Sequence, residues 1–176
     1  MWQHLREKIR QDIFEHGYNE KRQCFVQYYG SDELDASLLM MGLVGFLKPD
    51  DPRLVGTVKA IEQDLLKDGL VMRYRSDVDG LTGEEGSFLA CSFWLVDSFV
   101  LLGWKDKAQA LFERLMTLRN DVGLFSEEYC PIRKRMLGNF PQAFSHISHV
   151  NTAMNLSEAH GTVGDRDRTN GHATVP

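Results

Sequence analysis

The sequence has few cysteines, and their positions argue against two common kinds of site. Cys24, Cys91 and Cys130 are far apart and odd in number, and no two of them form a Cys-x-x-Cys pair. This pattern indicates neither a disulfide framework nor a zinc site. We therefore expect Cys91, which lies in an apolar stretch, to be a small core residue. We also expect a protein of the reducing cytoplasm that uses no metal or other cofactor.

Long apolar runs and an excess of positive charge are also absent. The longest apolar stretch, residues 88–102, is interrupted by Ser92, Asp97 and Ser98 and is shorter than the roughly 20 residues that span a bilayer. The first residues are charged and lack the apolar core of a secretory signal. A net charge of −5 gives nucleic acid no electrostatic attraction. We expect neither nucleic acid nor a membrane as a partner.

What the sequence does contain is an alternation of two kinds of predicted helix. Some segments are apolar on nearly all sides, which is typical of buried helices, and others carry a single apolar stripe. The predicted buried helices are residues 34–47, 86–102 and 141–159, and the amphipathic ones are residues 2–16, 52–68 and 105–119. Their alternation, with a period of roughly fifty residues, indicates an all-α fold built from repeated helical hairpins.

The loops that follow two of the amphipathic helices correspond to each other. Counted from Gly69 and Gly123, Arg73 and Glu127 occupy the same position. Equivalent loops would place this cation and this carboxylate at the same end of the assembly, as in a toroid of helical hairpins. An α-solenoid with a binding surface is an alternative, because helical hairpins are common in solenoids. The inner helices are, however, too apolar to line a solvated concave face.

The loop 120–139 contains the most informative residues for chemistry. Glu127 and Glu128 are adjacent and are flanked by Phe125 and Tyr129. This arrangement suits sugar chemistry, in which a carboxylate takes a proton from water beside an aromatic platform. A solvated pair of loop carboxylates would explain the same dipeptide.

Other candidate residues have simpler structural explanations. Arg73 and Asp77 could bind sugar hydroxyls through fork-shaped hydrogen bonds, or could form an ordinary surface ion pair. Glu85 precedes a predicted helix, where capping and the helix dipole favour acidic residues. Trp94 is predicted to lie in the core, where its indole N–H needs a partner. His146 and His149 are interpreted as ordinary helix residues, because no third metal ligand lies nearby.

Several blocks of the sequence resemble, in order, the C-terminal half of glycoside hydrolase family 15. They include Leu124-Phe125-Ser126-Glu127-Glu128-Tyr129 and Gly138-Asn139-Phe140-Pro141-Gln142-Ala143-Phe144-Ser145-His146, and further blocks lie at residues 18–27, 34–39, 68–74 and 85–97. The resemblance implies an (α/α)6 toroid that hydrolyses α-glucosidic bonds with inversion. It also implies that Glu127 is the general base, that Arg73 and Asp77 bind the sugar at the non-reducing end, and that Glu85 lies close to that subsite.

One element of the family pattern is missing. The family's general acid is a Glu that follows a Trp, whereas the three Trp residues here precede Gln3, Leu95 and Lys105. An inverting mechanism needs both carboxyl groups. We therefore expect residues 1–160 to be the C-terminal segment of a catalytic domain, an incomplete toroid that is inactive alone, and residues 161–176 to be a disordered tail.

Two functional hypotheses follow from the family resemblance and from the missing general acid. In the first, the chain acts together with its missing N-terminal half on an α-glucoside of the starch, maltooligosaccharide or trehalose type. In the second, it is a non-catalytic helical remnant, or a module that binds glucosides or a protein partner. The sequence does not separate these hypotheses.

Overall fold

The computed structural model describes residues 1–75 and 86–157. Asp77, Glu85 and the expected tail 161–176 therefore lie outside the described residues. The helices are α1 (Trp2–His16), the short 3-10 helix η1 (Ala36–Leu39), α2 (Met40–Leu43), α3 (Pro52–Leu65), α4 (Leu89–Leu101), α5 (Lys105–Met116) and α6 (Ala143–Leu156). Three small antiparallel sheets accompany them: β1 (Tyr18–Asn19) with β2 (Cys24–Phe25), β3 (Leu66–Lys67) with β4 (Leu70–Val71), and β6 (Glu128–Cys130) between β5 (Ser87–Phe88) and β7 (Arg135–Leu137).

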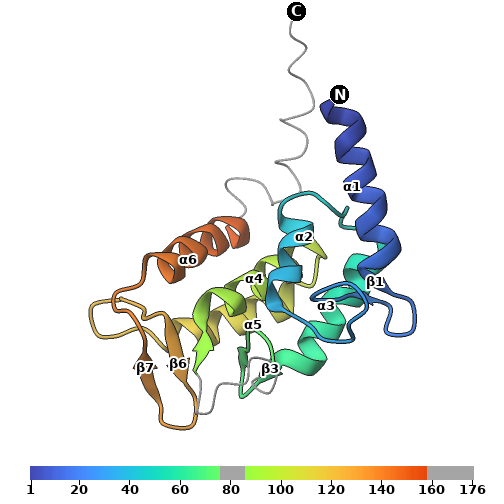
Figure 1. Cartoon of the computed structure of the whole chain (residues 1–176). Helices are drawn as coiled ribbons and strands as arrows, with labels where there is room; N and C mark the ends of the chain where they lie inside the picture. Colours follow the sequence, from blue (N-terminus) through green and yellow to red (C-terminus); the bar gives the residue numbers. More distant parts are fainter. Residues whose placement is uncertain (76–85, 158–176) are drawn as a thin grey trace, which may run out of the picture.

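Helix α4 is the centre of the molecule. It packs against α5, α6, α2, α3 and η1, which lie around it in Figure 1. Its residues are mostly apolar, and its buried polar side chains, such as Asp97, have hydrogen-bond partners, so the helix can be buried on nearly every face. The prediction of a buried helix over 86–102 is confirmed, except that Ser87 and Phe88 form strand β5.

The amphipathic helices α3 and α5 cover α4 with their apolar faces. Asp51 caps α3 by accepting a hydrogen bond from the Arg53 N–H at 2.9 Å, and Pro52 occupies the first turn. The predicted stripe is buried, namely Leu54, Val58, Ile61 and Leu65. The helix ends at Leu65, earlier than predicted, because Asp68 and Gly69, with φ of 52° and 76°, form the turn of the β3–β4 hairpin.

The prediction of one long buried helix over 34–47 is wrong. The chain forms only η1 and the single turn α2 there, and it turns away at Gly45, where φ is 73°. Gly42 allows a close approach, because a Cβ at this position would lie 2.8 Å from Leu101 and 2.9 Å from Leu54. Two glycines within four residues weaken the helix, and packing against α4 and α3 then determines the path of the chain.

Helix α6 forms near the predicted place, but the prediction of a buried helix holds for only one of its faces. The face that packs on α4 is polar, and its buried residues are Ser145, Ser148, Thr152 and Asn155. The Asn155 amide donates to Asp97 Oδ1 at 2.9 Å, and the Thr152 hydroxyl donates to the Phe93 carbonyl at 3.4 Å. The apolar side chains of α6 are exposed, namely Phe144, Ile147, Val150 and Met154.

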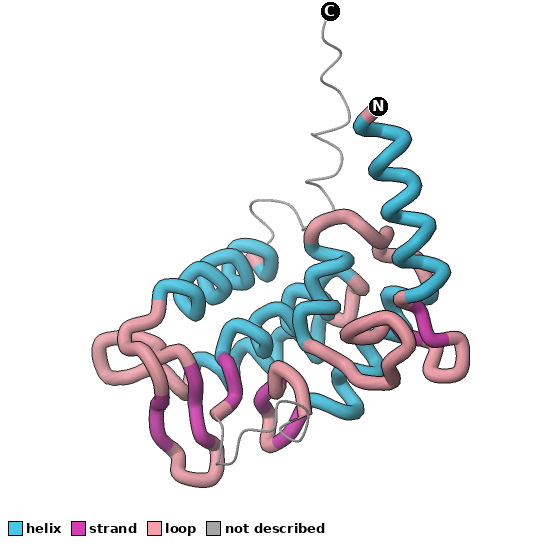
Figure 2. Tube along the Cα trace, viewed as in Figure 1, coloured by secondary structure: helices cyan, strands magenta, loops and turns pink. Residues whose placement is uncertain are grey.

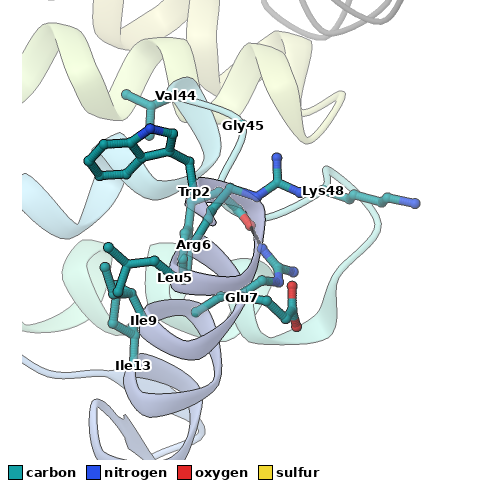
Figure 3. A pocket seen from close by; sticks show the side chains of 11 residues that line it. Trp2, Leu5, Arg6, Glu7, Ile9, Ile13, Val44, Gly45 and Lys48 are labelled. Carbon is teal, nitrogen blue, oxygen red and sulfur yellow. Dashed lines mark hydrogen bonds between the residues drawn. The ribbon is translucent and has the colours of Figure 1, made fainter.

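Helix α1 confirms the predicted amphipathic helix over 2–16, but it also has an exposed apolar face. Trp2, Leu5 and Ile9 line a hollow of about 760 Å³ together with Val44 and Phe46 (Figure 3). The far half of α1 is attached to the domain, because Phe14 stacks on Phe46 at 5.4 Å. This hollow is larger than the pocket of about 310 Å³ that Glu127 lines, and apolar side chains dominate its walls.

These two exposed faces lead us to expect that the purified chain self-associates. Replacing Ile147 on α6 with Lys should reduce the association, because it places a charge in the apolar face. Gln109→Lys adds the same charge to the exposed face of α5 and is the matched control. Sedimentation velocity measures the effect. A wild-type chain that stays monomeric at high concentration would contradict the expectation.

Candidate functional site

A pocket of about 310 Å³ lies at the N-terminal end of α4, on the side of the molecule where Figure 2 shows the short strands of β3 to β7. Four separate segments build it: the chain after β4, the β5–α4 junction, the residue before β6, and the start of α6. Its lining residues are Arg73, Phe88, Ala90, Cys91, Trp94, Glu127, Gln142, Phe144 and Ser145. The structure therefore brings Arg73 and Glu127, the two residues at equivalent loop positions, into one pocket.

Glu127 is held at this pocket by Asn139. Its backbone N–H donates to the Asn139 carbonyl at 2.9 Å, and its carboxylate Oε2 accepts from the Asn139 backbone N–H at 3.1 Å and from its side-chain amide at 3.0 Å. Gly138 makes this contact possible, because a Cβ there would lie 2.7 Å from Oε2. The other carboxylate oxygen, Oε1, accepts no hydrogen bond from the described residues, which leaves it available to a water molecule.

The residues just before Glu127 are attached to helix α6. The Phe125 N–H donates to His146 Nε2 at 3.1 Å, the Phe125 carbonyl accepts from Gln142 N–H at 3.0 Å, and the Ser145 hydroxyl donates to the Ser126 carbonyl at 2.7 Å. Beneath them, His149 packs against Phe125 with ring centroids 5.4 Å apart. Burial lowers the pKa of His149, and His146 and Arg119 lower it further, so His149 is neutral in this aromatic cluster near pH 7.

The expectation that Phe125 and Tyr129 form an aromatic platform beside Glu127 is wrong. Phe125 is 0% exposed and lies in the core against Phe93, at a centroid distance of 5.7 Å. Tyr129 packs against the same core and does not line the pocket. The hydrogen bonds of the Phe125 backbone to His146 and Gln142 hold this residue against α6, where its ring packs on Phe93 and His149.

Glu128 lies on the other side of the chain from Glu127. It belongs to β6, pairs in register with Phe88 and Leu137, and packs against Gly86, where a Cβ would lie 2.7 Å from its Oε2. Successive side chains of an extended chain point to opposite faces. Of the two adjacent carboxylates, Glu127 is the one that lines the pocket.

Arg73 stands at the rim of the pocket. Its side chain is 53% exposed, and its Nε lies 3.6 Å from Oδ2 of the buried Asp35. The Arg73 carbonyl also accepts from the Ala36 N–H at 2.7 Å. Asp35 is therefore an acidic neighbour of Arg73 that no spacing pattern connects to it. Asp77, which the sequence suggested beside Arg73, lies outside the described residues.

The apolar wall of the pocket contains residues that sequence reasoning assigned elsewhere or missed. Trp94, expected in the core, is only partly buried, and its ring meets Phe144 edge to face at 6.1 Å. Cys91 lines the same pocket, and burial raises the pKa of its thiol to about 12, so this part of the wall is uncharged. The sequence did not indicate Phe144 as a pocket residue, because an apolar residue in a helical pattern is interpreted as a core residue. It did not indicate Asn139 either, because the contact of Asn139 with Glu127 depends on the β6–β7 hairpin.

The described part of the chain contains no cluster of three or more His, Cys, Asp or Glu that could hold a metal ion. It also contains no helix that is long and apolar enough to cross a membrane. Chemically, a carboxylate with one oxygen fixed and the other free, beside an apolar wall and a guanidinium, can take a proton from water next to a bound polyol.

Comparison with known proteins gives a consistent result. The profile of the family described as Glycosyl hydrolases family 15 matches residues 1–154. A trehalase of Mycobacterium tuberculosis is 47% identical over 160 residues, which are 90% of this chain and 23% of the relative, and a trehalase of Thermoplasma acidophilum is 42% identical, over 90% of this chain and 27% of the relative. The chain thus spans about a quarter of these relatives.

Solved structures show the same fold. A glycosidase variant superposes with a TM-score of 0.74 at 22% identity, over 87% of this chain and 43% of that chain. A second variant of a glycosidase, in complex with glucose, gives the same score, identity and coverage. At this identity the likeness shows the fold alone.

Proposed function

Because this chain belongs to glycoside hydrolase family 15, we propose that it is the C-terminal segment of an inverting hydrolase of α-glucosidic bonds, in which Glu127 is the general base. The observation that carries the proposal is the pair of hydrogen bonds from Asn139 to one oxygen of Glu127. This carboxylate lines a pocket that Arg73 also lines. These hydrogen bonds orient the carboxylate before the substrate binds, as a catalytic base requires.

The proposed reaction uses two carboxyl groups. Oε1 of Glu127 takes a proton from a water molecule, and this water attacks the anomeric carbon on the face opposite to the leaving group. A carboxylic acid on the other side protonates the leaving oxygen. No Glu follows a Trp in this chain, so we assign the acid to the N-terminal region of a longer protein. Arg73 donates hydrogen bonds to hydroxyls of the glucose at the non-reducing end, and Asp77 and Glu85 belong to the same subsite.

The architecture that we propose for the whole domain is an (α/α)6 toroid. Helices α4 and α6 would belong to its inner ring, and α3 and α5 to its outer ring. Support comes from the exposed apolar faces of α1 and α6, which need a covering layer, and from the 43% of the solved glycosidase chain that this chain covers. The N-terminal region of the longer protein would pack on these faces and leave Phe144, which lines the pocket, uncovered.

The substrate we propose is trehalose, in which two glucose units are joined through their anomeric carbons. Its support is that the relatives at 40–47% identity are all called trehalases. Maltooligosaccharides and starch present the same non-reducing glucose to Arg73 and are the alternative. We keep the cytoplasm as the proposed compartment, because the three cysteines are all free and buried.

A non-catalytic, glucoside-binding role is the second candidate. It is favoured by one observation: among the residues that line the described pocket, Glu127 is the single carboxylate. In this case the chain would bind a glucoside through Arg73 and the apolar wall, and would not hydrolyse it.

Activity measurements separate these two candidates. We expect the purified 176-residue chain to release no more glucose from trehalose than its Glu127→Gln variant, because a general acid commonly contributes about 10²–10⁴-fold. Co-expression with the preceding region of the Mycobacterium tuberculosis trehalase should form an assembled enzyme with activity that depends on Glu127. A pure complex that is inactive would refute the hydrolase proposal, and turnover by the chain alone would refute the assignment of the acid to another region.

A further inference from the structure

Trp94 is an exception in the most deeply buried helix of the protein. Every other residue from Leu89 to Phe99 is buried, whereas Trp94 is only partly buried and lines the pocket. Ala90 and Cys91 line the same pocket, and residues three and four apart share one face of a helix. The face of α4 that looks into the pocket is therefore Ala90, Cys91 and Trp94, two small side chains followed by one large aromatic ring.

The indole group of Trp94 has an unused donor. No described residue accepts a hydrogen bond from its N–H, although the indole N–H of a buried Trp usually finds a partner. The Trp94 carbonyl, by contrast, accepts from the Ser98 hydroxyl within the helix, at 2.9 Å. Trp94 thus brings to the pocket an aromatic side chain whose N–H no described residue uses.

Phe144 extends this apolar surface from a second helix. Its ring stands nearly perpendicular to that of Trp94, at 80° and a centroid distance of 6.1 Å, and the side chain is 59% exposed. The first turn of α6 holds its backbone, because the Gln142 side chain accepts from the Phe144 N–H at 3.3 Å. The two rings therefore form adjoining walls, and Arg73 and Glu127 line the same pocket.

This distribution of groups matches a pyranose ring. One face of the sugar presents C–H groups, which pack on aromatic rings, while its edge presents hydroxyls, which need charged or polar partners. We propose that Trp94 and Phe144 form the platform on which a glucose unit of the substrate packs, with the Trp94 N–H free to donate to a hydroxyl. The proposal rests on the proposed function, since it concerns the same pocket. Because Glu127 lines the same pocket, a sugar that packs on Trp94 would lie beside the carboxylate and its water molecule.

Saturation-transfer NMR on the 176-residue chain tests the platform, using methyl α-glucopyranoside as the probe. This measurement observes the sugar and is efficient for large particles, so self-association does not prevent it. Irradiation of aromatic protons should saturate the ring hydrogens of one sugar face more than those of the other. Sorbitol is an open-chain polyol that offers hydroxyls but no pyranose ring, and it should give no such pattern.

Variants identify the platform residues. Trp94→Ala and Phe144→Ala should each weaken binding by about tenfold, equivalent to about 1.4 kcal/mol. Phe144 is exposed, so its variant should fold even if Trp94→Ala does not, and Trp94→Phe keeps the ring but removes the donor. Trp104→Phe is the matched control, because Trp104 packs on Phe99 at 5.7 Å and lies outside the pocket.

Each result has a distinct meaning. One-sided saturation that is lost in the Trp94 and Phe144 variants, and kept in Trp104→Phe, would establish the platform. Sugar binding that survives Phe144→Ala and Trp94→Phe unchanged would overturn it, and so would the absence of saturable binding in the wild-type chain. The proposed hydrolase function is judged separately, by the dependence of the assembled enzyme on Glu127, and can stand when the platform fails.

Discussion

In the assembled enzyme, Glu127→Gln should lower kcat for trehalose by roughly 10²–10⁴-fold, the usual contribution of a general base, while KM changes little. The amide keeps the size of the side chain and can still accept from Asn139, but it cannot take a proton from water. The base acts on water and contacts the sugar weakly, so the ground-state complex should be preserved. Initial rates over a range of trehalose concentrations measure both constants.

The adjacent carboxylate supplies the control. Glu128→Gln should be much milder, because Glu128 packs against Gly86 on the other side of the chain. Azide is a nucleophile that needs no base, so it should rescue Glu127→Ala and give a glucosyl azide of inverted configuration. An inactive Glu128→Gln beside a nearly normal Glu127→Gln would show that the catalytic assignment is displaced by one residue.

Gly56→Ala should have the largest effect on stability, and its sign opposes helix propensity. Alanine in a helix interior is favoured over glycine by about 0.5–1 kcal/mol. In α3, however, a Cβ on residue 56 would lie 1.9 Å from the backbone oxygen of Gln23, and a backbone atom cannot move aside as a side chain can. We expect the clash to win and the free energy of unfolding to fall by about 3 kcal/mol.

Urea unfolding followed by circular dichroism at low protein concentration measures this change. The segment next to Gln23 is bound to α3, because the Phe25 N–H donates to the Thr57 hydroxyl at 3.0 Å, so the clash should also separate β2 from the helix. Gly30→Ala is the control: φ is +78° there and a Cβ meets nothing within 4 Å, so only backbone strain of about 1 kcal/mol is expected. A Gly56→Ala chain as stable as the wild type would contradict the proposed contact.

The sequence predicted best those features that depend on neighbouring residues. The start of α3 followed from a proline after a capping Asp51, and the burial of α4 followed from an apolar run. The meeting of Arg73 and Glu127 in one pocket agrees with their equal distance from Gly69 and Gly123, a local count that a repeated hairpin turns into proximity.

Features that depend on distant contacts escaped prediction. The pairing of β6 with β7 brings Asn139 to Glu127, and the anchoring of Phe125 on His146 turns its ring into the core. An apolar pattern also indicates that one face of a helix is more stable when it is buried, but it does not indicate which element packs on that face. This is why Phe144 on α6 was expected in the core, whereas a polar face of that helix packs on α4.

The polar contact between α6 and α4 has a consequence for the precision of the pocket. Two helices that meet through apolar faces can slide past each other with little loss of packing free energy, because one apolar neighbour replaces another. If α6 slid along α4 by one turn, about 5.4 Å, Asn155 would leave Asp97, Thr152 would leave the Phe93 carbonyl, and each buried group would lose a partner. Ser145 and His146 are on the same helix and hold the residues before Glu127. The hydrogen bonds of Thr152 and Asn155, two and three turns further along α6 than Ser145, therefore fix the position of α6 along α4. In this way they help to fix the position of the Glu127 carboxylate.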